Sequence, residues 1–179
     1  MADLLLPRRG LLALPALLAL AGCGFRPLYG SVAGGEDVRA DMASVAVTVP
    51  HGRLGQSLKA ALAADLNPSA LSVPAEYDLA ISLGRTTKAL AIQLNSVITR
   101  YDLILDAVFA LSRRSDAATV YQNRVRRIAS YNVSQEPYST QVAEEDAERR
   151  AAVEASRQIA TLIAVFFREQ KAGQAATAS

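Results

Sequence analysis

The chain has 179 residues, 19 basic and 17 acidic side chains, and a formal net charge of +2 at pH 7. A charge so close to zero does not indicate a nucleic-acid partner. Its single cysteine excludes an internal disulfide, so we expect one domain that is stabilised by packing.

Residues 1–22 have the pattern of a secretory signal peptide. Two arginines near the start precede an apolar stretch at 11–20, and the small residues Ala21 and Gly22 precede the expected cleavage site. The apolar stretch is shorter than the ~20 residues that a membrane-spanning helix needs. We therefore expect cleavage before Cys23.

The four residues Leu-Ala-Gly-Cys that end at Cys23 resemble the bacterial lipobox, in which the cysteine sulfur receives a diacylglyceryl group. A plain secretory signal with an ordinary cysteine is the competing interpretation. Lipidation is the stronger prediction because this cysteine is the only one and follows the small residues directly. Two or more acyl chains would anchor the chain stably in a membrane. Gly24, where many inner-membrane lipoproteins have Asp, favours the outer membrane.

The first half of the remaining chain predicts a tether, a strand and a helix. Residues 23–42 mix glycine, proline and charges, which is typical of a tether. Residues 44–49 alternate and are rich in β-branched side chains, which predicts a strand. Residues 53–66 have a leucine at every fourth position, which predicts a helix with one apolar face.

Three further strands are predicted in the middle of the chain. Residues 77–83 alternate apolar and polar side chains, and residues 97–111 show the clearest alternation of the chain. A polar turn at 113–116 separates that strand from another at 119–131. The last two strands should therefore form a hairpin.

A single long helix is predicted for residues 140–170. Its acidic first turns suit the helix dipole, and alanine and larger apolar residues follow one side. Residues 171–179 are small and polar, so we expect a disordered tail. The whole order predicts an α+β two-layer sandwich spanning 43–170, with two helices on one face of a four-stranded, mostly antiparallel sheet. The other face should be polar, basic and partly exposed.

The sequence contains no recognisable catalytic motif. His51 is the only histidine, and no serine–histidine–aspartate set, phosphate-binding loop or dinucleotide motif occurs. Asp102 and Asp106 share a strand face but lie about 13 Å apart, too far for a carboxylate pair that acts on a sugar. We expect no enzymatic activity, no metal and no cofactor.

The residues after Cys23, Gly-Phe-Arg-Pro-Leu-Tyr-Gly at 24–30, resemble the mature start of LptE-family lipoproteins, in particular the alphaproteobacterial ones. The order of elements, the third strand with Tyr101 and the acidic-then-apolar last helix are also similar. The resemblance implies a lipid-anchored protein that forms a plug inside an LptD-type outer-membrane β-barrel. Such proteins help to assemble the barrel and bind lipopolysaccharide, and they perform no covalent chemistry.

Basic residues gather in the predicted sheet. Residues 85–127 contain eight basic and three acidic side chains, whereas residues 136–157 contain three basic and six acidic ones. Arginine binds phosphates, such as those of lipid A, through two parallel donors, and a barrel lumen favours a polar plug. For each single arginine, a solvated position without a ligand is the competing interpretation. The candidate lipopolysaccharide-binding residues are Arg85, Lys88, Arg100, Arg124 and Arg126.

Two alternatives remain open at the level of sequence. An auxiliary lipoprotein of an envelope lipid transporter of the ABC or MCE type would have a similar anchor and a similar small domain. A lipid-anchored hydrolase would need a pocket with convergent polar groups. The partner that is recovered from membranes separates the first alternative from the LptE-like function.

Overall fold

The protein is described by a computed structural model that covers residues 35–92 and 98–177. The predicted signal peptide and the predicted lipidation of Cys23 lie outside the described residues. No helix among those residues is long and apolar enough to cross a membrane. The elements are α2 (Gly35–Ala43), β1 (Val45–Thr48), α3 (Arg53–Leu66), β2 (Tyr77–Ile92), β3 (Ile98–Arg113), β4 (Thr119–Asn132) and α4 (Pro137–Thr177).

The sheet is a three-stranded antiparallel meander with one short parallel strand added. The strand order is β1-β2-β3-β4, and Val45 of β1 lies opposite Tyr77 of β2. β2 pairs with β3 and β3 with β4 along almost their whole lengths. These pairings confirm the predicted four-stranded, mostly antiparallel sheet and the hairpin between the last two strands.

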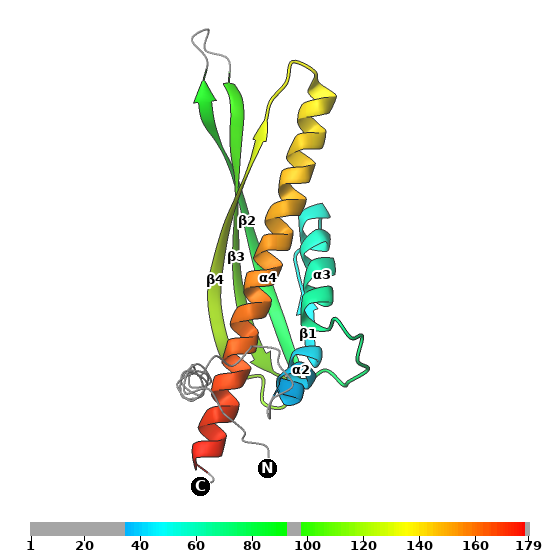
Figure 1. Cartoon of the computed structure of the whole chain (residues 1–179), viewed down its shortest axis with the longest axis vertical. Helices are drawn as coiled ribbons and strands as arrows, with labels where there is room; N and C mark the ends of the chain where they lie inside the picture. The colour runs from blue at the N-terminus through cyan, green and yellow to red at the C-terminus, as the bar shows by residue number, and fades with distance from the viewer. Residues whose placement is uncertain (1–34, 93–97, 178–179) are drawn as a thin grey trace, which may run out of the picture.

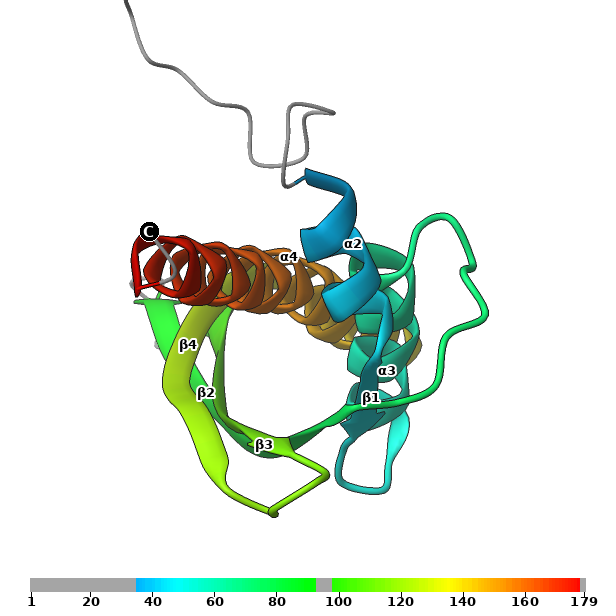
Figure 2. The ribbon, with the colours of Figure 1, turned by 90° about the horizontal axis from the view of Figure 1, so that it is seen from below.

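The helices lie on the concave face of the strongly curved sheet, with α3 beside α4 (Figures 1 and 2). α3 turns Leu58, Leu62 and Leu66 into the core, as their spacing predicts. α4 has 41 residues, so it is about 60 Å long and runs along the sheet from end to end. The predicted α+β fold, with two helices on one sheet face, is therefore confirmed.

Small side chains let α4 approach the sheet closely. Ala147, Ala151 and Ala155 follow one side of the helix and are fully buried. They face an apolar sheet surface to which β3 contributes every second residue, as the alternation predicts. The β3 residues of this core are Leu103, Leu105, Ala107, Phe109 and Leu111.

Both ends of the domain extend beyond the predicted boundaries. The expected tether at 23–42 contains helix α2, whose Val38 and Met42 are 4% and 2% exposed in the core. The last helix begins at Pro137 and continues to Thr177, into the tail that was expected to be disordered. A salt bridge of 2.9 Å between Lys171 and Asp41 joins these two ends. Packing of Val38 and Met42 in the core thus orders α2, whereas residues 172–177 are exposed and continue α4 through an alanine-rich sequence.

Candidate functional site

The convex face of the sheet points away from both helices. In β3 the side chains that alternate with the buried ones point to this face, and the register aligns them with outward side chains of β2 and β4. We call this surface the outer face. Its residues in the middle of the sheet are Lys88, Asp102, Ile104, Asp106, Val108, Arg124, Arg126, Ile128 and Ser130.

Two arginines of β4 converge on one aspartate of β3. Arg124 Nη2 lies 2.8 Å and Arg126 Nε 2.9 Å from Asp106 Oδ1, and Arg126 Nη2 lies 3.1 Å from Oδ2. The hydrogen bonds from Arg126, and then those from Arg124, hold the pKa of Asp106 below its usual range. The group has two positive charges and one negative charge, so it keeps a net charge of +1. Guanidinium N–H donors that do not bind Asp106 remain at the surface.

Aliphatic side chains border this charged group. Val108 is 50% exposed and Ile128 is 54% exposed. Val108 lies opposite Arg124 in the register, and Ile128 lies two residues from Arg126 on the same face. The outer face therefore presents cationic donors directly beside apolar surface, which suits a ligand with both an anionic and an apolar part.

The five predicted binding residues do not all lie on this face. Lys88 lies opposite Asp102, and Arg124 and Arg126 lie two strands away on the same side. Arg100 pairs with Asn132 near the end of the sheet, and its position two residues before Asp102 places it on the outer face. The structure thus brings the two β4 arginines together, with Lys88 and Arg100 farther along the outer face.

Arg85 lies on the concave side, where it belongs to an ionic cluster. Arg85 Nη1 lies 3.0 Å from Glu148 Oε1, and Arg53 Nη2 lies 2.9 Å from Glu148 Oε2. Glu144 pairs with Arg85, and Glu145 pairs with Arg53. The cluster joins β2, α3 and α4. Arg85 therefore has a structural role that its place in a basic stretch of sequence does not reveal.

Two acidic residues of these ion pairs are not among the site residues predicted from the sequence: Asp106, the shared partner of the two arginines, and Glu148, the centre of the cluster. A pattern could have found the first: Asp106 is an acidic residue facing outward in the strand that pairs with Arg124 and Arg126. No sequence signal indicates Glu148, because it belongs to an acidic stretch that fits a helix N-terminus equally well. Among the described residues, no group of three or more metal-ligating side chains is assembled.

Comparison with solved structures places the fold among small α+β domains of bacterial lipoproteins. A protein of Caulobacter crescentus CB15 described as a lipoprotein is 26% identical, with a TM-score of 0.64 over 75% of this chain and 97% of that one. Rare lipoprotein B of Shewanella oneidensis is 12% identical, with a TM-score of 0.55 over 71% of this chain and 96% of that one. Lipoprotein B of Nitrosomonas europaea is 16% identical, with a TM-score of 0.53 over 69% and 83%. The last two likenesses concern the fold alone.

The family follows from the sequence itself. Residues 42–163, which include β1 to β4, α3 and most of α4, match the LptE family, described as lipopolysaccharide-assembly. The chain belongs to this family, and its role lies in lipopolysaccharide assembly. The family that was predicted from the sequence is thereby confirmed. A comparison with curated proteins gives no match.

Proposed function

We propose that this chain is an outer-membrane lipoprotein, anchored through Cys23, that plugs an LptD-type β-barrel and assists lipopolysaccharide transport to the cell surface. The proposal that the chain binds lipopolysaccharide rests on the outer face. There, Arg124 and Arg126 share Asp106 beside the exposed Val108 and Ile128.

The chemistry of this surface suits lipopolysaccharide. Lipid A has phosphates and acyl chains close together. A guanidinium binds a phosphate through two parallel hydrogen bonds, and this geometry makes arginine more specific than lysine. Aliphatic side chains beside the arginines can contact the first carbons of an acyl chain. Binding in this proposal involves no bond formation or cleavage, and it needs no metal or cofactor.

The shape and surface of the domain support the proposal that it forms a plug inside a β-barrel. The molecule is long and narrow, with α4 running parallel to its long axis (Figure 1). Its outer face combines charged and hydroxyl groups with a few exposed aliphatic ones. The lumen of a large outer-membrane barrel is polar and filled with water, so a plug needs a polar surface of this kind.

Reversing the charge of the two arginines tests ligand binding. Arg124→Glu with Arg126→Glu should weaken binding to lipopolysaccharide vesicles by about tenfold or more, because good charge-assisted pairs contribute roughly 1.5–3 kcal/mol. A matched control is Arg149→Glu with Arg168→Glu, which changes the charge equally on the exposed side of α4. The control should bind as the wild type does.

The measurement is a titration of the protein against the vesicles, with thermal unfolding as a check of the fold. Equal binding by the double variant and the wild type would remove both arginines from the site. Equal weakening by the double variant and the control would show that binding depends only on total charge.

A further inference from the structure

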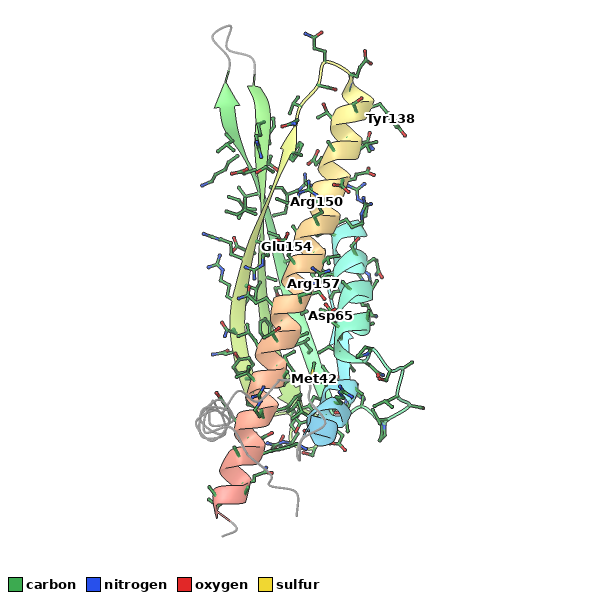
Figure 3. The ribbon with its side chains drawn as sticks, in the orientation of Figure 1. Met42, Asp65, Tyr138, Arg150, Glu154 and Arg157 are labelled. Carbon is green, nitrogen blue, oxygen red and sulfur yellow. The ribbon has the colours of Figure 1, made fainter. Side chains whose placement is uncertain are left out.

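A pocket of about 480 Å³ opens where α2, α3 and α4 meet, away from the outer face. In Figure 3, Asp65 and Arg157 are labelled between α3 and α4, with Met42 below them. The volume lies within the range of pockets that bind small ligands or side chains. Its walls include Arg39 and Met42 of α2, Asp65 and Leu66 of α3, Leu71 of the following loop, and Arg157 of α4.

The pocket combines an apolar base with charged walls. Met42 and Leu66 are 2% and 4% exposed. Leu71, in the loop after α3, is 45% exposed, so its apolar side chain can contact an occupant. Asp65 accepts a hydrogen bond from the buried Ser156 hydroxyl, which fixes the carboxylate beside the pocket. Arg157 supplies a planar guanidinium that can stack on an aromatic ring. Asp65 is the one acidic residue of the lining, beside the basic Arg39 and Arg157, so an occupant with aromatic and apolar side chains and a single arginine can pair that arginine with Asp65.

The chain itself supplies such a segment just before α2. Residues 25–29 read Phe-Arg-Pro-Leu-Tyr, which are three large apolar side chains, one arginine and one proline, without an acidic residue. Residues 30–35 that follow are small, with three glycines. A purely flexible linker is rich in glycine and serine throughout, so large apolar residues at 25–29 require another explanation.

The segment can reach the pocket. The first described element is α2, and its Arg39 and Met42 line the pocket. Five residues separate Tyr29 from Gly35, so the Cα atoms of these two residues can lie up to about 20 Å apart when the chain is extended. Arg39 lies only one helical turn beyond Gly35. The end of the described chain therefore lies next to the pocket, well within reach of residues 25–29.

We propose that residues 25–29 dock into this pocket within the same chain. Phe25 or Tyr29 packs against Met42 and Leu71 and stacks on Arg157, and Arg26 pairs with Asp65. Pro27 restricts the backbone before docking, which lowers the entropy lost on binding. Docking would hold the anchored N-terminus at the α2 end of the domain, so the opposite end of the domain, where β2 ends at Ile92, would point away from the membrane.

Photo-cross-linking of the full chain in membranes tests the docking. p-Benzoylphenylalanine is placed at position 29, and mass spectrometry identifies the residues that it joins after illumination. We expect cross-links to Met42 and Leu71 in the same chain. The control has the same label at position 138, where the native tyrosine is 77% exposed at the opposite end of the molecule, and it should give neither product (Figure 3). Cross-links that avoid the pocket, or that join two copies, would overturn the proposal.

Proteolysis gives a second, independent readout. Chymotrypsin cuts after Tyr29, which docking should protect. Thr161→Trp changes an exposed residue of the lining and fills the pocket, so cleavage should become about tenfold faster, which corresponds to about 1.4 kcal/mol of lost docking. Glu154→Trp lies about two turns earlier on α4 and outside the lining, and it should leave the rate unchanged. Equal rates for the wild type and both variants would overturn the proposal.

Discussion

Glu148 is the one charged residue that is buried among the described parts of the chain, at 4% exposure. Both carboxylate oxygens are used, one by Arg85 and the other by Arg53. A buried carboxylate is tolerated when its partners compensate the loss of hydration. The residue therefore fixes the relative positions of β2, α3 and α4 at one point.

Removing this charge should destabilise the fold. Glu148→Gln should lower the free energy of unfolding by about 2–3 kcal/mol, the value typical of hydrogen bonds to charged groups. The loss is smaller than for a fully buried pair because the Arg53 and Arg85 side chains are 56% and 41% exposed. Chemical denaturation measures it, with Glu154→Gln on the exposed side of α4 as the control. A Glu148→Gln variant as stable as that control would show that the cluster contributes little.

The pKa of Asp106 determines how stability depends on pH at the outer face. Hydrogen bonds from Arg126, and then from Arg124, lower this pKa below the ordinary value of 3.8. A group whose pKa is depressed by folding stabilises the protein above its unfolded pKa, and this contribution disappears as pH falls through the folded value. The difference in unfolding free energy between the wild type and Asp106→Asn should be constant above about pH 5 and shrink below about pH 4.

Denaturation curves recorded across this pH range check the expectation. Arg126→Gln should make the pH-dependent part smaller, because the largest cause of the shift is then removed. A difference between the wild type and Asp106→Asn that persists unchanged to pH 2 would contradict the role given to Asp106.

A close approach between the backbone at Pro50 and the first turn of helix α3 fixes where that helix starts. Gly55 lies in its first turn, and a Cβ atom placed there would lie 2.1 Å from the carbonyl oxygen of Pro50. The chain that leaves β1 must therefore pass directly over the helix. Only glycine leaves room for this path without moving the backbone.

Gly55→Ala should destabilise the protein by about 1–3 kcal/mol, because overpacking forces the backbone to shift. Gly173→Ala in the last turns of α4 is the matched control, since nothing lies within 4 Å of its added Cβ. That control should be neutral or stabilising by up to about 1 kcal/mol, because alanine favours a helix. Thermal unfolding of the two variants measures the difference, and equal melting temperatures would refute the steric argument.

The proposed barrel partner of the whole molecule can be tested directly. Purification of the chain from membranes in mild detergent should recover a large β-barrel protein in equal amount. Recovery of a periplasmic lipid-transfer complex instead would favour the alternative of an auxiliary transporter lipoprotein. Recovery of the chain alone would refute both partners.

Local pattern alone was enough for most of the fold. Leucines four residues apart specify α3, strict alternation specifies β3, and the polar turn before β4 specifies the hairpin. The opening residues after Cys23 were enough for the family, which the match over residues 42–163 confirms. These signals are local, so they can be read without knowing which elements are neighbours.

The tertiary structure alone decided which basic residues act together. Sequence position groups Arg85 with Arg124 and Arg126, but β2 directs Arg85 toward the helix side, where Glu144 and Glu148 of α4 meet it. Helix α2 and the pocket beside it could not be predicted from the sequence either, because Val38 and Met42 gain their apolar partners only when α3 and α4 pack. Burial and ion pairing depend on contacts between distant segments, and no local pattern of residues specifies those contacts.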